Sequence, residues 1–333
     1  MNTLFFRRKK FLFGCLSAGI LLLAASAVTL YTIRATLEDL IRPAAGDRIG
    51  SATPADLGLP YTAVEFKSGS GLRIRGWFIR GNTESCVVLG PGKGANRWDV
   101  LSYAPFLYRA GYSVLLFDPR STGLSQGEKY AFGYFESRDM IRAAAYLEAA
   151  HRVEHVGILG FSAGGTAAIL AALEEPRIKA VVADSAFASL DRAAAGSMSG
   201  IRKLLFKSVL PVFRIQAERM LEVDVFEELD LTDKIRNLEK PVFFIHGTRD
   251  QVIDPGNSEM LHCLAPGPKD LWRVPGAGHV QAFSHRPQAY KDRVLDFFER
   301  NLRDSGPIGP VSGKGSSPQA GLFDLGGARR GVP

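Results

Sequence analysis

One short stretch in the middle of the chain constrains the fold more than any other, because an apolar run ends there in a serine flanked by glycines. Residues 156–159 have the length of a buried strand, Gly160-Phe161-Ser162-Ala163-Gly164 follows, and residues 166–173 are rich in alanine and favour a helix. A strand, a sharp turn and a helix in this order hold a serine with its hydroxyl exposed at the carboxyl end of the strand. Glycines on both sides of the turn are needed because a Cβ atom would collide where the strand and helix pack around it. The stretch predicts a nucleophilic Ser162, and a purely structural glycine turn is the alternative.

A serine nucleophile needs a base to take its proton and an acid to orient that base. After a turn of this kind the acid and then the histidine are expected further along the chain. Asp250 follows the apolar run 242–245, and His279 follows the next such run, 271–274. Parallel strands present their carboxyl ends at one edge of a sheet, so both side chains are expected to converge on Ser162. Asp254, in the same loop as Asp250, is the alternative acid.

Stabilising a tetrahedral intermediate also requires two backbone N–H donors. The amide of Ala163 is one candidate because it begins the helix that follows Ser162. The amide of Lys93 is the other, in the glycine-rich loop 90–94, where Pro91 has no N–H to offer. The loop lacks the Gly-Lys-Ser/Thr ending of a phosphate-binding loop. The sequence implies no metal and no organic cofactor.

The distribution of apolar runs predicts the rest of the fold. Eight strands are expected, at residues 61–67, 72–78, 86–89, 113–117, 156–159, 178–183, 242–245 and 271–274. The first two alternate apolar and polar residues around a Ser-Gly-Ser-Gly turn and predict a hairpin, whereas the later runs are continuously apolar and separated by helix-length segments. The pattern predicts an α/β fold with a mostly parallel sheet, closed by an amphipathic helix at residues 287–302.

Residues 190–233 do not fit this alternation. They contain apolar and basic stretches interrupted by Pro211. Their length favours a small helical cap over an ordinary crossover helix with a long loop.

The two ends of the chain differ from its body. Residues 11–33 form an apolar run without a charged side chain, long enough to cross a bilayer, and four basic residues at positions 7–10 precede it. The positive-inside rule then places the domain on the extracytoplasmic side of the cell membrane, in a single-pass arrangement. Cleavage of a signal peptide after Ala25-Ser26-Ala27, which would give a secreted protein, is the alternative. We therefore expect residues 1–34 to be the anchor, 35–60 a linker, 61–303 the domain and 304–333 a disordered tail.

Charge and cysteine content add two further expectations. The net charge is +7, but positions 7–10 supply four of these charges and the tail after Asp304 a net two, so that residues 11–304 carry +1. A body so close to neutral gives no reason to expect nucleic acid as a partner. Cys86 and Cys263 could form a disulfide if the domain is exported, and the sequence leaves this open.

The chain resembles the α/β-hydrolase superfamily over residues 61–302, and within it the serine aminopeptidase-like and monoacylglycerol-lipase-like branch with membrane-anchored members. Besides the Ser162, Asp250 and His279 pattern, the resemblance rests on two segments, 110–120 (AGYSVLLFDPR) and 123–127 (GLSQG). Two positions differ from the family pattern. Pro91-Gly92 replaces the common His-Gly, and Ser121-Thr122 replaces the common Gly-His.

We interpret the sequence as that of a serine hydrolase that cleaves a carboxylic ester or thioester, lipids included, through an acyl-enzyme on Ser162. Amide cleavage of the aminopeptidase kind, with Glu218, Glu222 or Asp224 holding the substrate amine, uses the same three residues and stays open. A non-catalytic binding protein that kept the fold is the remaining alternative. The sequence does not indicate an oligomeric state.

Overall fold

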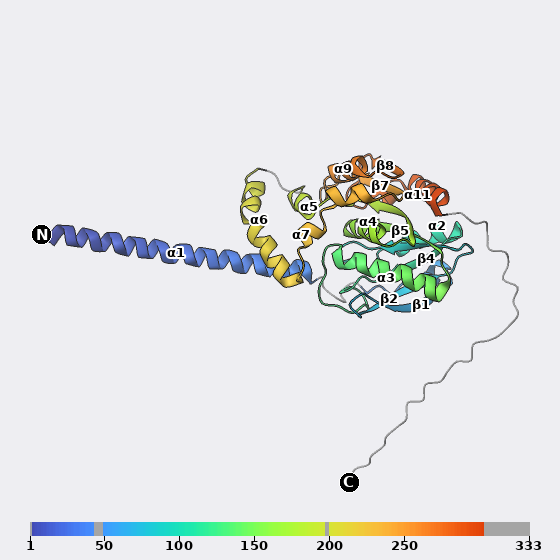
Figure 1. Ribbon diagram of the computed structural model, residues 1–333, viewed down its shortest axis with the longest axis horizontal. Helices are drawn as coiled ribbons and strands as arrows, with labels where there is room; N and C mark the ends of the chain where they lie inside the picture. Colours follow the sequence, from blue (N-terminus) through green and yellow to red (C-terminus); the bar gives the residue numbers. More distant parts are fainter. Residues whose placement is uncertain (1, 43–48, 197–199, 303–333) are drawn as a thin grey trace, which may run out of the picture.

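The structure is a computed structural model, and it describes residues 2–42, 49–196 and 200–302 of the 333-residue chain (Figure 1). Within these residues a single eight-stranded sheet has the order β1-β2-β4-β3-β5-β6-β7-β8. The strands are β1 (Thr62–Lys67), β2 (Arg73–Ile79), β3 (Ser85–Gly90), β4 (Ser113–Phe117), β5 (His155–Phe161), β6 (Ile178–Asp184), β7 (Val242–Gly247) and β8 (Lys269–Val274). Strand β2 is antiparallel to β1 and β4, and the other pairs are parallel. The prediction of a mostly parallel eight-stranded sheet flanked by helices is confirmed.

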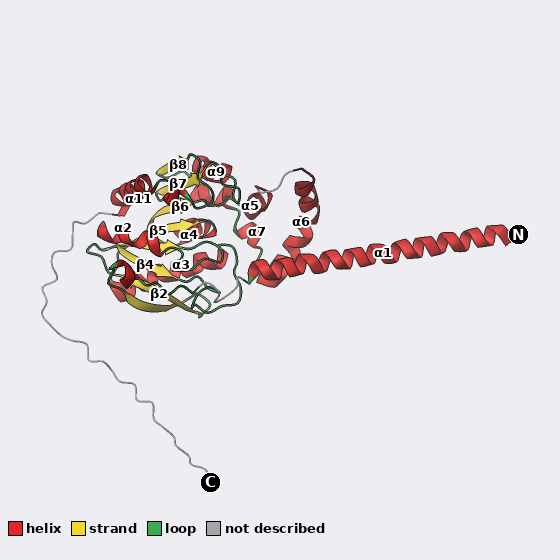
Figure 2. Cartoon of the chain, turned by 180° about the vertical axis from the view of Figure 1, so that it is seen from behind, coloured by secondary structure: helices red, strands yellow, loops and turns green. Residues whose placement is uncertain are grey.

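Helices cover both faces of the sheet, as Figures 1 and 2 show. The helices are α1 (Asn2–Ile41), α2 (Ala104–Arg109), α3 (Tyr134–His151), α4 (Ala163–Glu174), α5 (Leu190–Gly196), α6 (Gly200–Leu221), α7 (Val225–Glu228), α8 (Leu231–Lys234), α9 (Gly256–Leu264), α10 (Ala282–His285) and α11 (Pro287–Leu302), with short 3₁₀ turns at Pro54–Leu57, Leu101–Tyr103 and Ile235–Asn237. In β3, Cys86 and Val88 belong to the core beneath α3 and α4, whereas Val87 and Leu89 belong to the core beneath α2 and α11. Burial of alternate residues on opposite faces explains why this strand is continuously apolar.

The register of the parallel strands sets where the loops leave the sheet. Phe161 at the end of β5 pairs with Asp184 at the end of β6, and Gly247 at the end of β7 pairs with Val274 at the end of β8. The loops that follow these four strands therefore emerge at one edge of the sheet, which is the edge where an α/β sheet binds ligands.

Helix α1 extends further than the sequence predicted. We expected a linker from residue 35, but α1 continues to Ile41, and its last turns pack against the domain. Ile33, Leu37 and Ile41 recur every four residues, form one stripe on the helix, and are 7%, 0% and 1% exposed within the core on the α3 and α4 side of the sheet. The amide of Tyr130 also donates to the carbonyl of Ile41 at 2.7 Å. Charged residues separate these apolar ones, and the sequence pattern of this segment therefore predicts a polar linker.

The remainder of α1 projects from the domain as one continuous helix (Figure 2). An 18-residue window within Leu16–Ile41 has a mean hydropathy of 1.9, and by length and composition the helix can serve as a membrane anchor or as a signal sequence.

The segment between β6 and β7 is helical, and α5, α6, α7 and α8 follow one another there. Pro211, which interrupts the apolar and basic stretches of this segment, lies inside α6. It is exposed, so water can solvate the carbonyl that it leaves without an intrahelical donor. Helix α6 lies beside α1 in both views, and Gln216 donates to the carbonyl of Leu30 at 3.4 Å. The predicted disordered tail, residues 304–333, lies outside the described part of the chain.

Packing of α1 on the core makes a prediction about stability. Replacing Leu37 by Ala should lower the free energy of unfolding by about 2–4 kcal/mol, because the change leaves a cavity in a closed core. Leu22→Ala is the matched control, since Leu22 is 70% exposed on the projecting part of the same helix. Urea denaturation of the full chain in detergent micelles, followed by tryptophan fluorescence, measures both variants. Equal stabilities would mean that α1 is not part of the core.

Candidate active site

Ser162 lies at the turn between β5 and α4 in a strained backbone conformation. Its φ is 53° and its ψ is −122°, a region that residues with a side chain rarely adopt. Its N–H donates to the carbonyl of Asp184 at 2.8 Å, and its carbonyl accepts from Gly165 at 2.9 Å. A Cβ on Gly164 would collide with the carbonyl oxygens of Gly90 and Pro91, so that glycine lets the start of α4 approach the loop after β3. The turn thus fixes the hydroxyl at the carboxyl edge of the sheet.

Both downstream residues reach Ser162. His279 Nε2 is 3.0 Å from Ser162 Oγ, and His279 Nδ1 is 2.7 Å from Asp250 Oδ2. An ionised carboxylate can only accept, so Nδ1 carries the proton and Nε2 is left to accept from the serine hydroxyl. His279 lies in the loop after β8 and Asp250 in the loop after β7, and the structure therefore brings together the three residues singled out by the sequence.

Asp250 is held in place and ionised by its surroundings. Its Oδ1 accepts from the amides of Val252 and Ile253 at 2.8 and 2.9 Å, and His246 Nε2 lies 3.2 Å from its Oδ2. Burial raises the pKa of the carboxyl, but hydrogen bonds from His246 and His279 and the backbone amide of Ile253 outweigh burial, so that the pKa is lowered from its usual value. Oδ2 therefore accepts from two imidazoles.

The alternative acid, Asp254, has a different partner. Its Oδ1 accepts from the amide of Gly256 at 2.8 Å, at the start of α9, and no described contact joins it to His279. This arrangement favours Asp250 over Asp254 as the partner of the histidine. His246 acts on Asp250 and is fixed on its other side by Ser258, 2.7 Å from Nδ1.

The sequence analysis missed a second buried polar cluster next to the site. Asp184 accepts from Ser185 Oγ at 3.0 Å and from the Tyr290 hydroxyl at 3.1 Å, while Ser185 Oγ accepts from the amide of Val280 at 3.1 Å. Asp184 thereby holds Ser162 through its backbone carbonyl, and Ser185 holds the residue after His279. The signal was the pair of polar residues, Asp184 and Ser185, that directly follows the apolar run 180–183.

Burial dominates the protonation of Asp184. It raises the pKa of this carboxyl from 3.8 to about 6, although hydrogen bonds from Ser185 and Tyr290 and the charges of His246 and His279 act in the opposite direction. Two aspartates near one histidine thus have pKa values that move in opposite directions, Asp250 ionised and Asp184 inclined to keep its proton.

The two expected oxyanion donors lie beside the serine. Ala163 is the first residue of α4, where an N–H has no intrahelical acceptor, and Lys93 lies in the loop after β3. Within the described part of the chain the Lys93 amide donates to no acceptor. A Cβ on the preceding Gly92 would lie 3.2 Å from the Ser162 Cβ, which shows how closely this loop approaches the serine. Both residues therefore lie next to Ser162, and their role as oxyanion donors stays a prediction.

Ser162 opens into a cavity of about 610 Å³ between the core, the cap and α1. Apart from Thr32, Thr36, Lys93 and Ser162 itself, every residue that lines it is apolar. Burial lowers the pKa of the Lys93 ammonium, and the charge of Asp39 partly offsets this. The cavity has the size and apolar character of a small-molecule site with a few polar groups.

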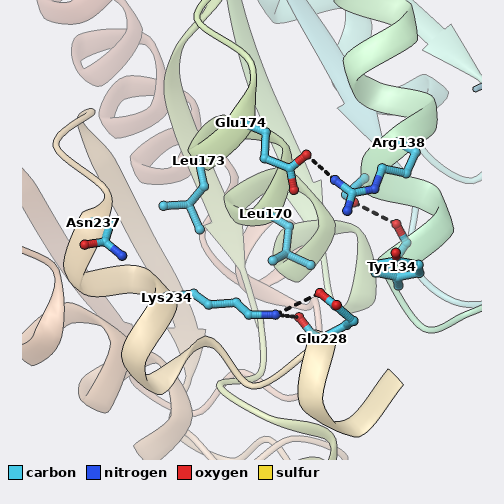
Figure 3. Close-up of a pocket in the computed structure, with 9 residues that line it drawn as sticks. Tyr134, Arg138, Leu170, Leu173, Glu174, Glu228, Lys234 and Asn237 are labelled. Atoms are coloured by element: carbon cyan, nitrogen blue, oxygen red, sulfur yellow. Dashed lines mark hydrogen bonds and ion pairs between the residues drawn. The ribbon is translucent and has the colours of Figure 1, made fainter. Parts of the chain in front are cut away.

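Another cavity, of about 290 Å³, lies away from these residues (Figure 3). Its charged side chains are paired, Arg138 with Glu174 and Lys234 with Glu228 at 2.9 Å. Mutual pairing explains this cluster without a ligand.

No cluster among the described residues is arranged to hold a metal ion. Cys86 is buried in β3, where burial raises its pKa, and Cys263 is exposed on α9. Both are free thiols, so the structure does not join them in a disulfide.

The raised pKa of Asp184 makes a prediction about stability. The native carboxyl keeps its proton up to about pH 6, whereas an unfolded aspartate loses it near 3.8, so the native state binds more protons within that window and the carboxyl stabilises it less as pH rises. Between pH 4 and pH 6 the free energy of unfolding of wild type should therefore fall by on the order of 2 to 3 kcal/mol relative to that of Asp184→Asn. Denaturant unfolding of both proteins measures the difference, from which other titrating groups cancel. If the difference between the two free energies of unfolding stays constant from pH 4 to pH 6, the raised pKa of Asp184 is contradicted.

Comparison with known proteins agrees with this geometry. A family model described as alpha/beta hydrolase fold matches residues 86–205. The chain is 27% identical over 252 residues to YqkD of Bacillus subtilis, covering 73% of this chain and 81% of that protein, and 28% identical over 253 residues to YfhR of Escherichia coli K12, covering 72% and 81%. It is also similar to the structure of the Pyrococcus furiosus esterase Pf2001, with a TM-score of 0.64, 25% identity and coverage of 78% and 100%. An α/β-hydrolase fold with esterases among its structural neighbours suggests a hydrolase, and it supports placing this chain in the α/β-hydrolase superfamily.

Proposed function

We propose that this chain is a serine hydrolase that cleaves a carboxylic ester or thioester through an acyl-enzyme on Ser162. The observation that carries the proposal is the continuous hydrogen-bonded chain from Ser162 Oγ through His279 to Asp250, opening into an apolar cavity. This arrangement supplies a nucleophile, a base and an orienting acid within proton-transfer distance. Esterase structures among the relatives support the same reaction class.

The proposed reaction has two halves. Ser162 Oγ attacks the carbonyl carbon as His279 Nε2 takes the hydroxyl proton, and the resulting oxyanion accepts from the amides of Ala163 and Lys93. Collapse breaks the bond to the alcohol or thiol, which leaves with the proton from His279. His279 then takes a proton from water, whose hydroxide attacks the acyl carbonyl carbon. Collapse breaks the bond to Ser162 Oγ, which takes the proton back from His279 as the carboxylic acid leaves. Asp250 keeps Nδ1 protonated and stabilises the imidazolium in both halves.

The cavity favours an ester substrate over a peptide substrate that carries a free amino group. An aminopeptidase requires an acidic group for the substrate amine, and none lines the cavity among the described residues. None of the three acidic candidates in the cap, Glu218, Glu222 and Asp224, lines the cavity. Glu222 lies 3.7 Å from Lys129, and Asp224 accepts from the amides of Phe226 and Glu227 at the start of α7. Buried polar residues arranged around a strained serine equally favour catalysis over a binding protein without activity.

The proposal also includes a role for residues 16–41 of α1 as a membrane anchor. We expect α1 to remain attached as a single-pass anchor, with the hydrolase domain on the extracytoplasmic side, because the helix passes without interruption from the apolar segment into the core. A cleavage site at residues 25–27 would lie inside this helix.

Labelling with a fluorophosphonate tests the nucleophile. Wild type should be modified at Ser162 and hydrolyse p-nitrophenyl acetate, and Ser162→Ala should lose both, with kcat lower by about 10⁶-fold because the attacking oxygen is gone. Peptide mapping by mass spectrometry locates the label. A label on another residue, or full activity in Ser162→Ala, would overturn the proposal.

The two aspartates of the loop after β7 offer a matched test of the acid. Asp250→Asn should lower kcat by about 10⁴-fold, because the amide no longer holds the imidazole in the required tautomer. Asp254→Asn should leave kcat within a few-fold of wild type, since its contacts are confined to the start of α9. Steady-state ester hydrolysis measures both variants. A larger loss of kcat in Asp254→Asn than in Asp250→Asn would assign the role of the acid to Asp254.

A further inference from the structure

The wall of the active-site cavity includes the helix proposed as the anchor. Thr32, Thr36 and Leu40 of α1 line the same cavity as Ser162. They recur every four residues and therefore form a stripe beside the one, Ile33, Leu37 and Ile41, that is buried in the core. The end of α1 is thus fixed to the domain by one stripe and faces the cavity with the other.

Helix α6 forms the neighbouring wall and has two apolar faces. Phe206, Val209 and Phe213 line the cavity. The outer face instead contains three apolar residues at i, i+3 and i+4 that are 60% to 66% exposed, namely Ile201, Leu204 and Leu205. A helix that meets only water on its outer side has no reason to place three large apolar side chains there, and an exposed apolar face of this kind with a nearby Lys207 is typical of a helix lying in a membrane interface.

The bilayer is the occupant that the structure favours for this outer face. Helix α1 is long and apolar enough to cross a membrane, and it leaves the domain on the side where α6 lies (Figures 1 and 2). Because α1 enters the core without a flexible joint, its orientation holds α6 close to any membrane that α1 crosses. The cavity lies between these two helices and the serine.

Resting on the proposed function, we infer that α1 and α6 form an acyl-chain channel between the bilayer and Ser162, and that the substrate is a membrane-resident ester or thioester of a long-chain fatty acid. The apolar chain enters between the two helices, its carbonyl stops at Ser162, and Thr36 sets the width of the channel from the α1 side. The anchor is then part of the specificity pocket and not only a tether.

Two threonines of α1 provide a matched test. Thr29 and Thr36 are both exposed, and the hydroxyl of each donates to the backbone carbonyl four residues earlier, at 2.9 and 2.8 Å. Only Thr36 lines the cavity. In the full chain in phosphatidylcholine nanodiscs, Thr36→Trp should lower kcat/KM for p-nitrophenyl dodecanoate relative to p-nitrophenyl acetate by about tenfold or more. Thr29→Trp should leave this ratio unchanged. Equal ratios in wild type and both variants would overturn the inference.

A measurement on wild type keeps the test independent of how the tryptophan variant folds. Dodecyl fluorophosphonate should label Ser162 at least about tenfold faster than the ethyl compound, because the apolar cavity binds the longer chain. Equal rates would overturn the channel, whereas no labelling by either compound would instead overturn the proposed serine nucleophile. The two failures are therefore distinguishable.

The outer face of α6 tests the approach from the membrane. Leu204→Glu combined with Leu205→Glu should reduce hydrolysis of p-nitrophenyl dodecanoate dissolved in the nanodisc bilayer several-fold and leave hydrolysis of p-nitrophenyl acetate from water unchanged, because neither leucine lines the cavity. Unchanged hydrolysis of both esters would show that α6 does not face the bilayer.

Discussion

The backbone strain at Ser162 is the constraint on which the site depends. A serine at φ 53° persists only where its surroundings leave no alternative, and here the carbonyl of Asp184 holds its amide while α4 packs against the loop after β3. The same close approach brings Gly92, the residue before Lys93, next to Ser162. Relaxing the turn would therefore displace the hydroxyl relative to this loop, which explains why glycines and a buried aspartate surround the serine.

Much of the fold was predictable because parallel strands buried on both faces leave an unmistakable apolar pattern. The eight runs of the sequence correspond to β1 to β8, and the common direction of β3 to β8 places the loops that contain Asp250 and His279 at the edge where Ser162 emerges. The distances could not be predicted, since the 2.7 and 3.0 Å contacts depend on loop conformations. Hydrophobic periodicity carries no information about loop conformation.

The features that were missed have a common physical cause. Ile33, Leu37 and Ile41 are separated by charged residues, and only the final packing of α1 shows that every fourth position is buried. Pro211 is tolerated in α6 because it is exposed, which a sequence does not reveal. Asp184 and Ser185 matter through contacts with Val280 and Tyr290, about a hundred residues away. In each case the role of a residue depends on its burial or exposure in the folded chain, which the local sequence pattern does not reveal.

Continuity between α1 and the core changes what an anchor can do. A flexible tether restricts a domain to the neighbourhood of a membrane but leaves its orientation free. Burial of Leu37 and Ile41 in the same core that supports β5 and α4 removes that freedom, because rotating the domain about α1 would expose those side chains. If α1 is the membrane anchor that we propose, a helix fixed in this way determines which face of the cap meets the bilayer. The proposal then implies that the cavity lined by the same helix is presented to the membrane in one orientation.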